Sequence, residues 1–135
     1  MRRALALTAA TALLAAGGAT TAAGATTHLR FFTVQTAMRD TDDGFLVIEK
    51  VLQDGRRVGT DRVVCIAGKR RFDCRMTVRL TGRGQIKLTT VVRELANVGP
   101  LKIVGGTGEF AGASGSGNYK DLSDVKTRVT LTITT

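Results

Sequence analysis

The sequence predicts an all-β domain of eight short antiparallel strands. Three observations support this class: several segments alternate apolar and polar residues with a period of two, turn-forming residues separate the apolar runs, and no segment of ten or more residues follows the helical period of 3.6. Eight strands in chain order fit either a closed up-and-down barrel or a two-sheet sandwich. In a barrel of this size, side chains fill the interior or surround one small ligand, so a lumen is the first place to look for function.

Three segments alternate cleanly and are expected to be strands with one buried face. "CRMTVRLT" places Met76, Val78 and Leu80 on one side, and "QIKLTTVV" and "VKTRVTLTITT" repeat the pattern. The turns carry Asp, Asn, Gly and Pro, as in "DDG", "DG", "GRG" and "NVGP". The expected strands span residues 29–36, 45–53, 57–66, 71–80, 84–94, 100–105, 115–122 and 125–134.

One expected strand is apolar on both faces. "FLVIEKVL" puts Phe45, Val47 and Val51 on one side together with Glu49, and Leu46, Ile48 and Leu52 on the other. A strand of this kind is typical of a sheet covered on both sides.

Residues 1–25 have the order of a secretory signal peptide. Arg2 and Arg3 precede an apolar run of about 13 residues, too short to cross a bilayer of about 30 Å, and the small residues that follow place cleavage after Ala25. The twin-arginine route is the alternative, but its polar flanks and aromatic residue are absent. We therefore expect a secreted, extracellular protein with one domain at residues 26–135 and no membrane span.

The two cysteines, Cys65 and Cys74, are expected to form a structural disulfide. A hairpin turning at Lys69 and Arg70 would place them opposite each other on neighbouring strands, and export would expose them to an oxidising environment. Their spacing does not fit a redox or zinc motif, and the chain has a single histidine.

The stretch "GGTGEFAGASGSG" (105–117) holds six of the 16 glycines and could be a phosphate-binding loop, a linker or a corner. It lacks the Gly-Lys-Ser/Thr of a P-loop and the third glycine of a dinucleotide fingerprint. Phe110 and Ala113 interrupt the polar run, which argues against disorder. We interpret it as a compact corner in which glycines adopt positive φ and Phe110 anchors the turn in the core.

The same stretch resembles the glycine-rich segment of the allene oxide cyclase and dirigent barrel family, as do "LRFFTVQ" and "DGRRVGTDRVVC" upstream. The resemblance covers residues 29–134 and implies a bacterial, calycin-like, eight-stranded antiparallel barrel. The matching positions of the glycine-rich motif are Gly105, Gly106, Thr107, Gly108, Phe110, Ala113 and Gly115.

The resemblance implies an activity in which the shape of the barrel interior directs the reaction of a bound molecule. The family includes cyclases of a fatty-acid epoxide, dirigent proteins that steer radical coupling, and polyketide cyclases, which work by holding a reactive molecule in one folded form. The matching motif is architectural, so no catalytic residue carries over from the family. We expect a small hydrophobic ligand in the lumen and cyclisation or isomerisation without a cofactor. A non-catalytic binding or envelope-associated protein is the alternative.

Site residues are nominated from the strand pattern alone. Phe45, Val47, Val51 and Leu88 are expected to line the lumen and bind the ligand. Glu49 shares the face of Phe45, Val47 and Val51, and if that face is the lumen its buried carboxylate suits acid–base work. The alternative is a surface glutamate paired with a basic neighbour.

Other polar groups carry weaker hypotheses. Tyr119, the only tyrosine, is expected to supply a pocket hydroxyl or to cap the barrel. Asp61 and Arg62 must face opposite ways, and an exposed ladder is the simpler interpretation. His28 lies near the mature N-terminus. We expect no metal site, because the sequence has no cluster of metal-ligating residues. We expect no serine hydrolase triad, because the serines have no histidine that could act as their base.

The excess of basic over acidic residues suggests a second class of partner. The formal net charge is +9, and +7 once Arg2 and Arg3 are removed. A cluster at Lys69, Arg70 and Arg71, near Arg56 and Arg57, could bind anionic polymers. Secretion and a low aromatic content argue against nucleic acid, and a soluble arginine-rich surface is the simpler interpretation. Homodimerisation is a further hypothesis.

Overall fold

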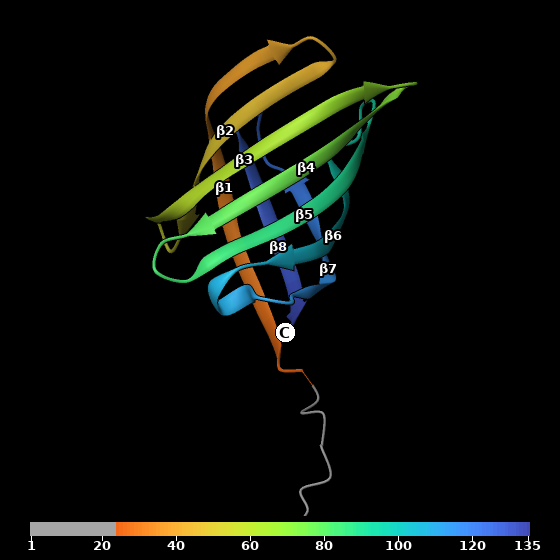
Figure 1. Cartoon of the computed structure of the whole chain (residues 1–135). Coiled ribbons are helices and arrows are strands. Elements are labelled where there is room, and N and C mark those ends of the chain that lie inside the picture. The colour runs from red at the N-terminus through yellow and green to blue at the C-terminus, as the bar shows by residue number, and fades with distance from the viewer. Residues whose placement is uncertain (1–23) are drawn as a thin grey trace, which may run out of the picture.

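A computed structural model describes residues 24–135, which form a closed antiparallel barrel (Figure 1). Each strand pairs with the next in the chain, and β8 pairs with β1 to complete the ring. This confirms the eight strands and decides for the barrel over the sandwich. The elements are β1 (Thr26–Thr41), β2 (Gly44–Gln53), β3 (Arg56–Gly68), β4 (Arg71–Leu80), β5 (Gly84–Arg93), β6 (Val98–Gly106), the 3-10 helix η1 (Gly108–Phe110), β7 (Ser114–Asp121) and β8 (Lys126–Thr134).

The predicted signal peptide lies, apart from Gly24 and Ala25, outside the described residues. Within residues 24–135, no helix is long and apolar enough to cross a membrane.

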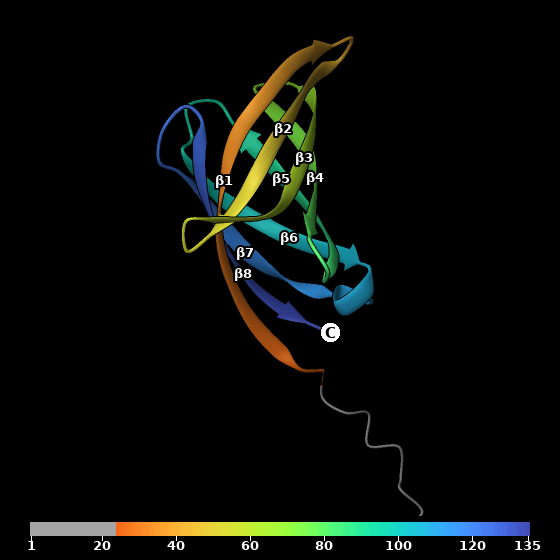
Figure 2. The same ribbon diagram turned by 90° about the vertical axis from the view of Figure 1, so that its left-hand side faces the viewer.

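Strand β1 is much longer than its sequence pattern predicts. Its first half pairs with β8 and its second half with β2, with an irregularity between Gln35 and Ala37. Figure 2 shows the β1–β2 hairpin extending beyond the neighbouring strands at one end of the barrel. Both ends of β1 are polar and exposed, so they carry no period-two signal.

The end of the barrel that holds the start of β1 is packed solid. Inward side chains from seven of the strands form one core, and the partly buried Val58 and Val63 of β3 pack against it, because alternate residues of each strand face the interior. Its innermost members are Phe31, Val51, Val78, Ile86, Leu88, Val129, Leu131 and Ile133.

The glycine-rich stretch forms the predicted compact corner and lies at this packed end. Phe110 of η1 is 3% exposed and packs into the core. Gly108 has φ 61° and approaches the Arg83 carbonyl so closely that a Cβ would lie 2.7 Å from its oxygen. Gly115 has φ 130°, a conformation that other residues rarely adopt. Outside the corner, the guanidinium of Arg83 donates to the Glu109 carboxylate at 2.7 and 3.1 Å.

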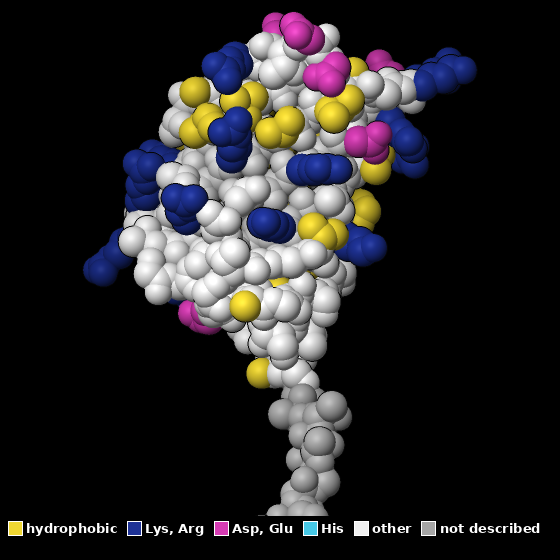
Figure 3. Space-filling view, viewed as in Figure 1, with side chains coloured by type: hydrophobic (Ala, Val, Ile, Leu, Met, Phe, Trp, Pro, Cys, Tyr) yellow, Lys and Arg dark blue, Asp and Glu magenta, His cyan; other side chains and the backbone are white. Residues whose placement is uncertain are grey.

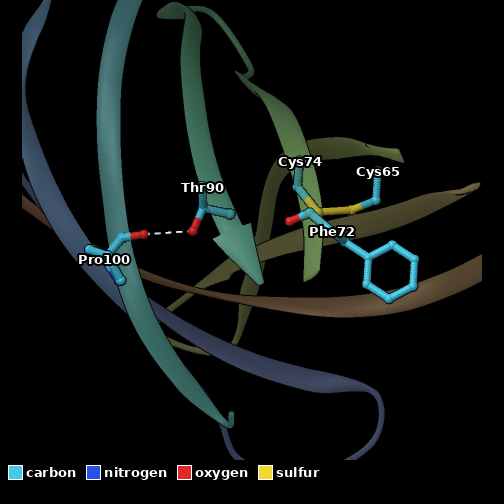
Figure 4. Close-up of a disulfide and its surroundings, with 5 residues drawn as sticks. All are labelled: Cys65, Phe72, Cys74, Thr90 and Pro100. Atoms are coloured by element: carbon cyan, nitrogen blue, oxygen red, sulfur yellow. Dashed lines mark hydrogen bonds between the residues drawn. A yellow bond between two sulfur atoms is a disulfide. The ribbon is translucent and has the colours of Figure 1, made fainter. Parts of the chain in front are cut away.

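The predicted disulfide is confirmed. Cys65 of β3 and Cys74 of β4 are direct ladder partners, with Cα atoms 4.1 Å apart, and the hairpin turns at Lys69 and Arg70. Figure 4 shows Phe72 close to the disulfide.

The expectation that β2 is covered on both sides is wrong for its outer face. In the part of the chain that the structure describes, no second layer lies outside the barrel. Leu46 is nonetheless buried, because its ladder partners Arg39 and Val64 flank it on that face, while Ile48 and Leu52 are half-buried.

Replacing Phe110 with alanine should lower the free energy of unfolding by about 3–5 kcal/mol, because the corner would lose its anchor and leave a cavity in the core. Urea denaturation followed by circular dichroism measures this. Phe32→Ala is the matched control: Phe32 is half-buried on the outer face beneath Arg30 and Lys126, so its loss should be much smaller. Equal losses in the two variants would contradict the anchoring role.

Candidate functional site

The other end of the barrel is hollow. A cavity of about 640 Å³ lies there, within the usual range of ligand pockets, roughly 300–1,000 Å³. Its lining includes Met38 of β1, Asn97 of the β5–β6 loop and the β7–β8 turn, residues 122–125. The interior of the barrel is therefore divided into a packed half and a half that can hold a ligand.

One side of the cavity is apolar. Side chains from β2 to β5 form this wall, together with the disulfide, which faces the cavity; they are Phe45, Val47, Val63, Cys65, Cys74, Met76 and Val92. Thr90 also borders the cavity but its hydroxyl donates to the Pro100 carbonyl at 2.6 Å (Figure 4). The wall offers an apolar molecule a largely aliphatic surface.

The opposite side is polar, and it comes mainly from β1, β2, β7 and β8. Thr33, Gln35, Glu49, Tyr119, Asp121 and Thr127 border the cavity there. Thr127 donates to the Asp121 carboxylate at 2.8 Å, which orients that acid.

Two carboxyl groups meet inside the barrel. Glu49 of β2 and Asp61 of β3 are direct ladder partners on the inward face, 9% and 1% exposed. Glu49 borders the cavity, whereas Asp61 lies behind it, with Val78 of β4 on its other side. Among the described residues, neither Asp61 carboxyl oxygen has a hydrogen bond within ordinary geometry.

The environment raises the pKa of both acids. Burial is the largest cause for Glu49; the polar side chains of Thr33 and Asp61 beside it oppose part of the rise in its pKa, and the charge of Asp121 adds to the rise. Burial, followed by the negative charge of Glu49, raises the pKa of Asp61 well above its usual value. Two adjacent buried carboxyls cannot both ionise easily. We therefore assign the proton to Asp61, the more buried member, and the negative charge to Glu49.

Tyr119 also borders this space, although its hydroxyl oxygen is itself buried. It is 7% exposed, and its Oη has no hydrogen-bond partner in residues 24–135. Burial and then the charge of Asp121 raise the pKa of Tyr119, so the phenol stays protonated and can donate. Its ladder partner Gly99 makes room for the ring, because a Cβ there would lie 2.7 Å from it.

The nominated residues divide between the two halves of the barrel. Glu49, Tyr119, Phe45 and Val47 border the cavity. Val51 and Leu88 do not; they are 0% and 1% exposed and belong to the packed core. The period of two identifies the inward face of a strand, but it does not reveal how far along the barrel a residue lies.

The sequence interpretation missed three parts of this site. Asp61 faces inward and Arg62 is exposed, so an exposed ladder at both positions is wrong. The signal was present, since Asp61 alternates with Val63 and Cys65 on one face. Thr33 and Asp121 were also missed.

His28 lies on an exposed end of β1, with its Nδ1 3.3 Å from the Thr132 hydroxyl, and does not border the cavity.

Charge is distributed unevenly between the outside and the inside. Figure 3 shows Lys and Arg side chains scattered over one face, with apolar side chains between them. All Lys and Arg residues from 24 to 135 are exposed or half-buried, and none borders the cavity. In the same residues, no group of three or more His, Cys, Asp or Glu is arranged to hold a metal ion.

No protein-family model matches the sequence, and no curated protein matches it either. Solved structures do. A pyocyanin demethylase superposes with a TM-score of 0.69 at 19% identity, over 80% of this chain and 100% of that one. The pterocarpan synthase dirigent protein GePTS1 gives 0.67 at 19% identity over 82% and 88% of the two chains, and PsPTS1 gives 0.59 at 18% over 82% and 94%. These matches confirm the dirigent-type fold that the glycine-rich motif predicted, and at such identities they show the fold alone.

The carboxyl pair should make the protein less stable as pH rises. The unfolded chain releases these protons near pH 4, whereas the folded barrel retains one, so stability falls from about pH 4 upward until the raised pKa of Asp61 is passed. We expect a lower urea midpoint at pH 8 than at pH 5. Asp61→Asn should raise the stability at pH 8 by on the order of 1 kcal/mol or more and flatten this profile.

Asp54→Asn provides the control, because Asp54 is an exposed acid in the β2–β3 turn whose φ of 49° asparagine accepts. It should keep the wild-type pH profile. A wild-type midpoint that rises from pH 5 to pH 8 would contradict the raised pKa values.

Proposed function

We propose that the lumen binds a small, mostly apolar molecule and that Glu49 and Tyr119 guide its isomerisation or cyclisation by proton transfer, without a cofactor. The observation that carries this proposal is a buried carboxyl pair without a basic partner at the edge of a cavity large enough for a ligand.

Binding follows from the two sides of the cavity. The aliphatic wall removes apolar surface of a ligand from water, and the few polar groups opposite it fix the orientation of that ligand. Holding a flexible molecule in one shape supplies much of the rate acceleration in an intramolecular reaction.

The chemistry follows from the different positions of the two acids. Glu49 borders the cavity, and burial raises its pKa, which makes its carboxylate a stronger general base. For an unsaturated ketone, Glu49 takes a proton from the carbon between the carbonyl and the double bond, and the electron pair moves onto the oxygen, to which Tyr119 donates. The same proton then returns at the far end of the double bond, which shifts by one position and restores the Glu49 carboxylate. Asp61 does not touch the ligand; it is a positioning residue that holds the second proton.

The open lumen favours this function over a purely structural barrel. Large side chains seal only the end closed by Phe110, while the other half keeps its volume and its acids. Three of the similar structures carry names of enzymes, one a demethylase and two pterocarpan synthases, which supports the use of this type of lumen for chemistry.

We also propose that the protein is exported and works outside the cytoplasm. The disulfide supports this, because such bonds persist mainly in oxidising compartments.

Filling the cavity should abolish ligand binding. Val63 and Val64 are neighbours on β3; the first borders the cavity and the second is exposed on the outer surface. With the neutral fluorescent probe N-phenyl-1-naphthylamine, we expect binding to the wild type, at least about tenfold weaker binding to Val63→Phe because the ring occupies ligand volume, and unchanged binding to Val64→Phe. No binding to the wild type, or equal binding to both variants, would overturn the lumen as the binding site.

Proton transfer is tested with 3-cyclohexen-1-one, whose conversion to the conjugated 2-cyclohexen-1-one is followed by ultraviolet absorbance. We expect the protein to accelerate this reaction over buffer, and Glu49→Gln to lower the rate by about 10²-fold or more, the usual contribution of general base catalysis. Asp54→Asn should retain the rate. Displacement of the fluorescent probe by the ketone without any acceleration would count against catalysis and favour a binding protein.

A further inference from the structure

The lumen has the opposite charge to the outside of the molecule. The residues that border the cavity include the acids Glu49, Asp121 and Asp124, with Asp61 directly behind, and none of the described Lys or Arg residues. The full chain is nevertheless strongly basic, with a formal net charge of +9. A cavity that only had to bury an apolar molecule would not need several acids and no base among its polar groups.

The basic surface does not neutralise these acids. The Lys and Arg side chains lie on the outer face or at exposed ends of the strands, where water and salt screen them within about 10 Å. The wall between is protein of low dielectric, which concentrates the field of the enclosed acids into the cavity. A positive charge inside the lumen therefore interacts mainly with Glu49, and at the mouth with Asp121 and Asp124.

An independent observation also points to an occupant of the cavity. The hydroxyl of Tyr119, in a side chain 7% exposed that borders the cavity, has no hydrogen-bond partner in the described part of the chain. A buried donor without a partner is costly and is usually satisfied by a ligand or an ordered water. Glu49 of β2 and Tyr119 and Asp121 of β7 thus border the same space from different strands.

We propose that the natural ligand is an apolar molecule carrying one positive charge, a quaternary or protonated amine, whose cationic end lies against Glu49 and Asp121. This inference rests on the proposed function and names its substrate class.

A single charge fits the interior best. Glu49 and Asp61 share one proton and together hold one negative charge, which one cationic centre neutralises. Asp121 and Asp124 are exposed at the mouth, where water solvates them, so they attract a cation without requiring a second one. The apolar wall formed by Val47, Val63, Met76 and Val92 receives the remainder of the molecule.

The experiment compares molecules of the same shape that differ only in charge. Benzyltrimethylammonium and its neutral carbon isostere neopentylbenzene, and the corresponding naphthylmethyl pair, are used to displace N-phenyl-1-naphthylamine from the full protein at pH 5 and pH 8. At pH 8 we expect the dissociation constant of each cation to be lower than that of its isostere by about tenfold or more. This is the difference expected from one favourable contact with a charged group.

The pH dependence has a defined sign. The ionisable groups that border the cavity are Glu49 of β2, Asp121 and Tyr119 of β7 and Asp124 of the β7–β8 turn, and Asp61 of β3 lies directly behind Glu49. The bordering polar residues of β1 and β8, Thr33, Gln35 and Thr127, carry no ionisable group. Raising the pH removes protons from the carboxyls, so the cation should bind more tightly at pH 8 than at pH 5, while the neutral isostere should not.

Variants separate charge from shape. Glu49→Gln should weaken the cations about tenfold and leave the isosteres unchanged, whereas Asp54→Asn, which removes a distant acid, should alter neither. Equal binding of cation and isostere at pH 8, or failure of both cations to displace a probe that does bind, would overturn the inference and leave the proposed lumen standing. Failure of the probe itself to bind would overturn both.

Discussion

Pairing of β1 with β8 is the constraint on which the rest of the molecule depends. Residues Thr26–Val34 pair in register with Lys126–Thr134, and this ladder joins the two ends of the described chain and leaves the sheet without a free edge. No layer of helices covers the sheet in residues 24–135, so the buried apolar side chains of the strands, apart from Leu46, lie on the inside of the ring. The strict alternation in β4, β5 and β8 is the sequence counterpart of that restriction.

Closure creates an interior, and side-chain volume decides which part of it stays empty. At the packed end, Phe31, Phe110 and many Leu and Ile residues from facing strands fill the space. At the other end many of the inward positions hold the smaller residues Thr, Val and Cys, and a cavity remains. The disulfide lies in this hollow half, where a covalent link between β3 and β4 supplies rigidity that core packing does not provide. The ligand site thus lies on strands that the disulfide holds in place, although no side chains fill the space between them.

The sequence predicts the strands and the corner well because their causes are local. Alternation, turn residues and the Gly-Gly-Thr-Gly-x-Phe segment each act over a few residues, and the hairpin that pairs Cys65 with Cys74 is similarly short. The site is harder to predict because it depends on depth within the barrel. Val51 and Glu49 share a face of β2 and lie two residues apart, yet one belongs to the core and the other borders the cavity. The side chains of β1, β3, η1 and β8 around Val51 and Glu49 decide which of the two lies in the core. The periodicity of β2 carries no information about these neighbours.

Asp61 shows most directly why the interior is interpreted as a site. A carboxyl that is 1% exposed is expected in a structural role only with a basic partner or several donors. This chain has many Lys and Arg residues, yet the nearest in sequence, Arg62, faces outward, and the group beside Asp61 is another acid. Replacement of such a pair by apolar residues of similar volume would be expected to stabilise the barrel. Stability alone therefore does not explain why the barrel contains this carboxyl pair. The proposed function does, because a barrel that holds and releases a proton beside a ligand needs carboxyl groups next to its cavity.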